Sequence, residues 1–253
     1  VEIDSSGARS LSAAGAFTMN SQIAAISLDG GSNALTIDAN GDSDVSIGAS
    51  ITAANENPVT INSEGGISIA AVDLYNAGSG GTGLFTLNAD NDNDGTTQNI
   101  ALSGTIDVGS FTVSGGSDSD ETISTASGIS ITSNKGAIDL KGTGGSALTT
   151  FNLTGDGTTV TVTNLDPSDS AITLPNVNGE GSGAGNEVSL TLTGTGSITV
   201  GNVDLNNGGG ATGGALSVTL DSENDSTSSL TAGTLTLGGF SISGGADNDE
   251  DFS

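Results

Sequence analysis

The sequence predicts an all-β chain wound as a parallel β-solenoid, and three observations indicate this. Apolar and polar residues alternate with a period of two in short segments, which is typical of strands with one buried and one solvated face. An apolar pattern with helical spacing is absent from the 253 residues, and the inward positions are mostly β-branched or Leu. The sequence also repeats itself, which is typical of extended architectures.

The expected strands are segments of three to five residues that follow one another along the chain. They are 67–69, 129–131, 138–140, 160–162, 188–192, 198–200, 216–220, 235–237 and 240–242. Glycine-rich turns are expected between strands at 29–31, 64–66, 207–210 and 244–245. We expect about eleven coils of about 20–25 residues, each with three short strands.

The internal repeat is clearest where residues 104–121 return at 233–250 with ten of the eighteen positions identical. Two shorter matches pair 72–74 with 203–205 and 25–36 with 137–149. We therefore interpret 1–253 as one continuous repetitive β domain. It holds two copies of a unit, at approximately 21–124 and 133–253.

The alternative architecture is a pair of tandem β-sandwich domains of about 120 residues each. A sandwich core usually contains large aromatic residues, whereas this chain has no Trp, one Tyr and six Phe. The narrow interior of a solenoid is better filled by aliphatic residues. The two copies also differ in loop length, which a solenoid tolerates between coils. These features favour the solenoid.

The composition excludes several classes of function. Thirty acidic residues against three basic ones give a formal charge of −27, so we expect repulsion from nucleic acid and from anionic lipid surfaces. The sequence has no apolar run of about 18 residues, so membrane insertion is not expected. His and Cys are absent, which removes imidazole and thiol chemistry. With few basic and aromatic residues for a lyase or hydrolase site, we predict that the chain is not an enzyme.

One acidic segment resembles the opening of a calcium-binding loop. Asp90, Asp92 and Asp94 alternate with Asn and precede Gly95, which would offer several oxygen ligands to one ion. The twelfth position of such a loop is normally Glu, but here it is Ala101. The alternative is a solvated acidic turn.

The repeat supplies a second pair of candidate calcium sites. Both copies place three carboxylates at the same offsets after a Gly-Gly pair. They are Asp118, Asp120 and Glu121 in the first copy and Asp247, Asp249 and Glu250 in the second. A weaker cluster consists of Asp38, Asn40, Asp42 and Asp44. Calcium is the expected cofactor. The alternative is that these carboxylates only solubilise a shared turn.

Several phrases resemble a known family. Residues 66–70 (GISIA), 127–140 (SGISITSNKGAIDL) and 196–205 (GSITVGNVDL) resemble the repeats of filamentous-haemagglutinin-like exoproteins. Those proteins are large secreted bacterial surface adhesins folded as right-handed parallel β-helices. The resemblance implies a right-handed solenoid, a role in cell adhesion, and an extracellular or cell-surface location.

We therefore expect the shaft of a bacterial surface adhesin whose partners are a host or neighbouring cell surface or a glycan. An alternative is a self-assembling protomer of an extracellular surface or matrix filament, as in a biofilm. Its partners would be other copies of the chain, joined end to end or laterally. A minor alternative is an ice-binding solenoid, indicated by Thr-x-Thr phrases at 159–163, 191–193 and 234–236.

Overall fold

The computed structural model describes residues 2–4, 9–13, 15, 17–19, 25–29, 33–77, 79–90, 95–116, 120–142, 148–180, 187–206, 213–223, 227–245 and 250–253. Within these ranges every regular element is a β-strand. No helix in this part of the chain has the length and apolar character needed to cross a membrane.

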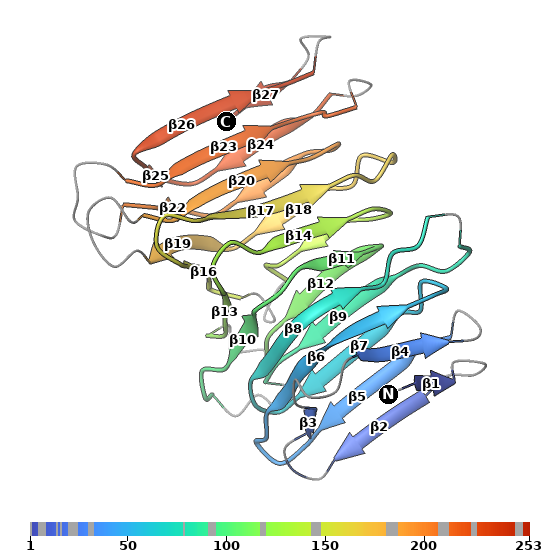
Figure 1. Ribbon diagram of the computed structural model, residues 1–253. Helices are drawn as coiled ribbons and strands as arrows, with labels where there is room; N and C mark the ends of the chain where they lie inside the picture. Colours follow the sequence, from blue (N-terminus) through green and yellow to red (C-terminus); the bar gives the residue numbers. More distant parts are fainter. Residues whose placement is uncertain are drawn as a thin grey trace.

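Parallel strands stack along the axis of a rod in three ladders, and the chain visits ladder one, ladder two and ladder three in turn (Figure 1). Ladder one contains β3 (Phe17–Met19), the first part of β6 (Val45–Ala53), the first part of β8 (Ile67–Asp73), β10 (Asn99–Leu102), β13 (Thr122–Thr125), β16 (Thr150–Thr154), β19 (Asn176–Glu180), β22 (Val203–Asp204) and β25 (Leu235–Thr236).

Ladder two and ladder three complete each coil. Ladder two contains β1 (Glu2–Asp4), β4 (Ala25–Asp29), the second parts of β6 and β8, β11 (Ile106–Val108), β14 (Ser130–Ser133), β17 (Thr159–Asn164), β20 (Ser189–Thr193), β23 (Ala215–Thr219) and β26 (Gly239–Ser243). Ladder three contains β2 (Arg9–Ala13), β5 (Leu35–Ala39), β7 (Val59–Ser63), β9 (Leu84–Asn88), β12 (Ser110–Ser114), β15 (Ile138–Asp139), β18 (Ile172–Leu174), β21 (Ile198–Val200), β24 (Ser229–Ala232) and β27 (Asp251–Phe252).

The predicted parallel β-solenoid is confirmed, and the tandem-sandwich alternative is not what the chain adopts. The expected coil length was too short. Between residues in register, one coil takes from 21 residues, between Ser50 and Ala71, to 34 residues, between Val72 and Ile106. In the described part of the chain, ladder three accordingly has ten strands, where about eleven coils were expected. Corner loops of unequal length explain the difference, because they add residues without changing the register of the strands.

The inward side chains form one continuous core along the rod. In ladder three, Val59, Phe85, Phe111 and Ile138 stand in register on successive coils, and all four are fully buried. The rings of Phe85 and Phe111 stack with centroids 5.2 Å apart and an interplanar angle of 22°. The narrow interior therefore has room for an aromatic side chain where an inward residue of the next coil packs over its ring.

The sequence repeat is out of phase with the coils. Within the matched segments, β11 lies in ladder two but β25 lies in ladder one, while β12 lies in ladder three and β26 in ladder two. The repeated unit is thus a strand, a corner and a strand, and its second copy is moved round by one face. The three ladders make the same demand on the sequence, with aliphatic residues inside and polar residues outside, so one unit suits any of them.

Candidate functional site

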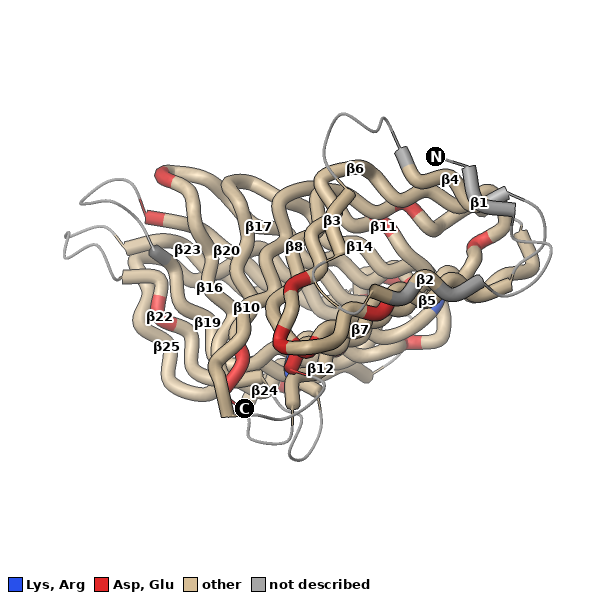
Figure 2. Tube along the Cα trace, turned by 90° about the horizontal axis from the view of Figure 1, so that it is seen from below, with Lys and Arg blue, Asp and Glu red and all other residues tan. Residues whose placement is uncertain are grey.

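Three of the four predicted acidic segments lie in turns that join ladder three to ladder one, within a run of four consecutive coils. The described residues of the four turns between β5 and β6, β7 and β8, β9 and β10, and β12 and β13 are called the acidic edge: 40–44, 64–66, 89–90, 95–98, 115–116 and 120–121. Neighbouring coils lie about 4.8 Å apart, so carboxylates on successive turns repel one another unless hydrogen bonds or cations compensate. Figure 2 shows that acidic residues recur along the rod while basic ones are rare.

Two turns of the acidic edge are joined by reciprocal bonds between carboxylates and backbone amides. The amide of Gly66 donates to Asp44 Oδ1 at 2.8 Å. In the opposite direction, Glu64 Oε2 accepts from the amide of Gly41 and from that of Asp42, the latter at 3.3 Å. Bonds from N–H groups to a charged carboxylate are stronger than neutral ones. These two acidic side chains therefore hold the turns together as well as solubilising them.

The Gly-Gly turn and its Glu are built in the same way in both copies of the repeat. A Cβ at Gly115 would overlap the carboxylate of Glu121, and a Cβ at Gly244 would overlap that of Glu250. In the second copy, the amide of Gly245 donates to Glu250 Oε1. The carboxylate thus folds back over the first glycine of the pair. This packing explains why glycine and glutamate recur together.

The two copies nevertheless lie on different edges of the rod. Residues 244–250 connect ladder two to ladder three, whereas 115–121 connect ladder three to ladder one. On the acidic edge, Asp120 Oδ2 accepts a hydrogen bond from Thr97 Oγ1 at 3.2 Å. Thr97 belongs to the turn that follows Asp90, which is fully buried with a φ of 47°. The structure therefore joins two candidate sites that the sequence presents as separate.

The other predicted ligands Asp92, Asp94, Asp118, Asp247 and Asp249 lie outside the described residues. Within the described ranges, no three acidic side chains are grouped closely enough to hold a metal ion. The carboxylate of Glu250 serves its own turn, as described above. Calcium binding at these turns stays a prediction, and it depends on the remaining carboxylates of the same loops.

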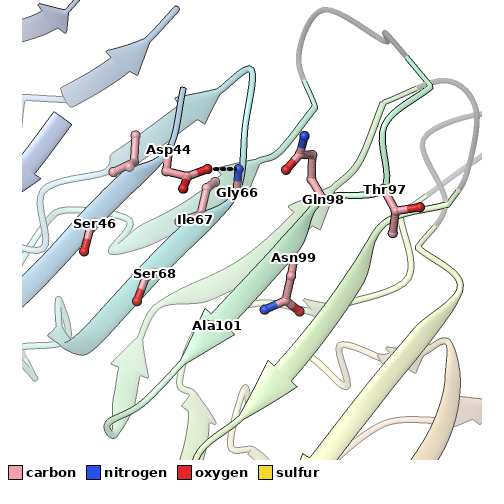
Figure 3. Close-up of a pocket in the computed structure, with 10 residues that line it drawn as sticks. Asp44, Ser46, Gly66, Ile67, Ser68, Thr97, Gln98, Asn99 and Ala101 are labelled. Atoms are coloured by element: carbon pink, nitrogen blue, oxygen red, sulfur yellow. Dashed lines mark hydrogen bonds between the residues drawn. The ribbon is translucent and has the colours of Figure 1, made fainter. Parts of the chain in front are cut away.

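A shallow groove of about 430 Å³ adjoins the acidic edge on the outer face of ladder one (Figure 3). Ser46 and Ser68 line one side, and Gln98 and Asn99 line the other. Its carboxylate is that of Asp44, which already accepts the amide of Gly66. The groove thus offers hydroxyl and amide groups for a polar ligand. Among its described lining residues, Asp44 is the one carboxyl group, whereas glycoside hydrolysis uses a pair.

The outer side of ladder two over β14, β17, β20, β23 and β26 presents hydroxyl groups in two columns, called the hydroxyl face. One column is Ser130, Thr161, Thr191, Ser217 and Ser241, and the other is Thr132, Thr163, Thr193, Thr219 and Ser243. Two of the predicted Thr-x-Thr phrases, 159–163 and 191–193, pair in register here, whereas the third, 234–236, belongs to ladder one. The ice-binding alternative stays a prediction.

Asparagine side chains stack along the outside of ladder three. Asn62 Nδ2 donates to Asp38 Oδ1 at 2.6 Å, and Asn88 Nδ2 donates to Asn62 Oδ1 at 2.7 Å. Ser114 Oγ continues the series by donating to Asn88 Oδ1. These bonds run along the rod axis between coils. Asp38, a member of the weaker predicted cluster, therefore has a structural contact in this series.

The edge between ladder two and ladder three contains an ion pair that spans several coils, called the lysine corner. The Lys135 ammonium binds Glu56 Oε2, whose side chain is fully buried. It also donates to the carbonyls of Ser79 at 3.4 Å and Gly81 at 3.2 Å, and it lies 5.9 Å from the centroid of the Tyr75 ring. One cation thus fastens the 74–83 loop to the rod. The sequence signal for this corner is weak, because its members are far apart in the chain.

The lysine corner lowers the pKa of Glu56. Burial alone would raise the pKa of this carboxyl. Hydrogen bonds from Lys135 and from the Asn76 amide, together with the lysine charge, outweigh burial and hold the pKa below its ordinary value. Glu56 therefore stays ionised and serves as an anchor for the loop.

Asp107 shows the opposite behaviour on the outer face of ladder two. Burial raises its pKa, and the charge of Asp73, its partner on the preceding coil, raises it further. Asn134 Nδ2 donates to Asp107 Oδ1 at 2.7 Å, and this hydrogen bond partly offsets the rise in the pKa. Two carboxylates in register thus repel one another here.

Comparison with family models, with curated proteins and with solved structures finds no match to this chain. A function is therefore proposed from the fold and from the sites described above.

Proposed function

We propose that this chain is a segment of an extracellular, rod-shaped β-solenoid that serves as the shaft of a bacterial surface adhesin. The observation that carries the proposal is the stack of three parallel ladders over one continuous aliphatic core. Every coil is bonded to the next through backbone ladders, so a load along the surface of the rod is shared by many hydrogen bonds. Such a structure suits a spacer between a cell and its target.

The outer surface supports a spacer role. The strands present Ser, Thr, Asn and Asp outward, and the described grooves on ladder one are open and are lined by these residues together with Val and Ile. The acidic charge would keep neighbouring rods apart and in solution. A target-binding function would then belong to loops or to further parts of the adhesin.

A second candidate is a filament protomer whose copies add end to end, and the last described coil shows the side chains that such a joint would cover. Phe240, Ile242 and Phe252 are in register with the buried Leu216, Val218 and Leu230 of the preceding coil, yet they are 42%, 40% and 53% exposed. The rings of Phe240 and Phe252 lie 5.9 Å apart. One further coil, supplied by the first coil of another copy, would cover these side chains and pair the open strand edges.

Sedimentation velocity of the 253-residue chain over a hundredfold concentration range separates the two roles. A shaft remains a monomeric rod, whereas a protomer forms longer species that Ile242→Lys abolishes. The matched control is Thr231→Lys, which adds the same charge to the outer face near the same end of the rod. A frictional ratio typical of a compact monomer, and not of an elongated one, would contradict the shaft proposal.

Calcium is proposed as a stiffening ion for the acidic edge. A divalent cation there would offset the repulsion between successive acidic turns. Negative-stain microscopy with calcium and with a chelator tests this role. Straighter or longer rods in calcium support it, and identical images contradict it.

A further inference from the structure

A groove of about 630 Å³ lies on the edge between ladder two and ladder three. It is called the apolar groove, and its lining includes Tyr75, Lys135, Leu165, Pro167 and Glu223. Leu165 is 45% exposed, and the other large hydrophobic side chains found exposed in the described part of the chain belong to the last coil. An aromatic ring, an exposed leucine and a proline thus meet at one place on an otherwise polar rod.

One wall of the apolar groove is a turn held rigidly by its own hydrogen bonds. The amide of Asp166 donates to Asn164 Oδ1 at 2.8 Å, and Asn164 Nδ2 donates to the Ser170 carbonyl at 2.8 Å. Asp166 in turn accepts from the Ser168 amide at 3.2 Å and from Ser170 Oγ. The buried polar groups fix the backbone that carries Leu165 outward. Its exposure is therefore built into the turn.

The opposite wall is the 74–83 loop, which the lysine corner holds in place. Asn76 Nδ2 donates to the Ala54 carbonyl at 2.6 Å, and the Gly83 amide donates to the Glu56 carbonyl at 2.8 Å. Together with the Lys135 contacts, these bonds place Tyr75 at the groove without a partner having to order the loop. A site with two preorganised walls loses little entropy on binding.

Charge selects the kind of partner. Lys135 is engaged by the buried Glu56, so its charge is largely compensated. Glu223 lines the groove, and Asp169 is exposed in the Leu165 turn. With a formal charge of −27 on the whole chain, the surroundings favour a cationic ligand and oppose an anionic one.

We propose that the apolar groove binds a short basic segment of a partner protein, which inserts an apolar side chain between Tyr75 and Leu165. Lysine or arginine residues flanking that side chain face Glu223 and Asp169. The arrangement has the apolar centre and polar rim of a protein interface. It is independent of the shaft proposal, because the groove is a lateral feature of the rod and needs neither a tip domain nor polymerisation.

Fluorescence polarisation with two labelled peptides tests the proposal on the 253-residue chain. The probes are Lys-Leu-Lys-Leu-Lys-Leu-Lys and Lys-Ser-Lys-Ser-Lys-Ser-Lys, which have equal charge. We expect the leucine peptide to bind about tenfold more tightly. Leu165→Ser should remove this preference, whereas Leu84→Ser, on the outer face of ladder three, should leave it intact.

The charge component is tested with Glu223→Gln and its matched control Asp251→Asn. Glu223→Gln should weaken the leucine peptide about two- to fivefold more than the control does. Circular dichroism confirms that each variant is folded, and both serine substitutions are at sites where the leucine is at least partly exposed. Equal binding of the two peptides to wild type, or an unchanged preference in Leu165→Ser, would overturn the proposal. Displacement of the leucine peptide by neutral cellohexaose would also overturn it, since the groove would then be a glycan site.

Discussion

Replacing Lys135 with Met removes the cation that fastens the 74–83 loop to the rod. Methionine keeps the length and the apolar stem of lysine, so the change isolates the ammonium group. Glu56 then keeps its hydrogen bond from the Asn76 amide but loses its counter-ion. The carbonyls of Ser79 and Gly81 lose the same donor.

The size of the effect follows from burial. Removing one partner of a buried ion pair typically costs about 3–5 kcal/mol. Glu56 is fully buried, but the Lys135 side chain is 33% exposed, so part of the interaction is screened by water. Glu56 also keeps other hydrogen-bond donors. We therefore expect Lys135→Met to lower the free energy of unfolding by about 2–3 kcal/mol.

Urea denaturation, combined with hydrogen exchange at the Gly83 amide, measures the loss globally and locally. The matched control is Lys141→Met, which removes the same charge from an exposed lysine. A double-mutant cycle with Glu56→Gln should give a coupling energy of at least about 1 kcal/mol. A Lys135→Met variant as stable as the Lys141→Met control would refute the role assigned to the lysine corner. So would additive effects in the cycle.

Three further predictions concern the carboxylates. Because the pKa of Glu56 is lowered by folding, its contribution to stability is present above the unfolded pKa of about 4.5 and is lost as the pH falls through the folded value. Urea titrations at pH 7 and pH 3 should therefore show that the stability gap between wild type and Glu56→Gln narrows in acid, and a constant gap would contradict this. Gly115→Ala should displace Glu121 and destabilise the chain by about 1–3 kcal/mol in the same assay. Gly80→Ala, where an added Cβ meets no atom within 4 Å, should have a much smaller effect, and equal losses would count against the turn packing. Millimolar calcium should raise the thermal midpoint of wild type more than that of Asp120→Asn in calorimetry, and an equal response would exclude Asp120 as a ligand.

The candidate sites were predictable only in part, because contacts between coils decide what an acidic turn does. The sequence at 115–121 shows the glycines and carboxylates of a turn, but it does not predict that Glu121 folds over Gly115. It also does not predict the hydrogen bond between Asp120 and Thr97 of the preceding turn. The apolar groove was not expected at all. Tyr75, Lys135 and Leu165 are far apart in the chain, and no local pattern links them.

The all-β class and the parallel solenoid were determined by the sequence alone, because a period of two in apolar residues commits each segment to one buried face whatever its neighbours are. The strands expected at 188–192 and 216–220 lie in register within one ladder for this reason. Coil length, the face that each repeat occupies and the side chains that share an edge were decided only by the tertiary structure. Corner loops vary in length while the backbone pairing between coils stays in register. Which loops meet therefore depends on the stacking of the whole rod, and local sequence does not record it.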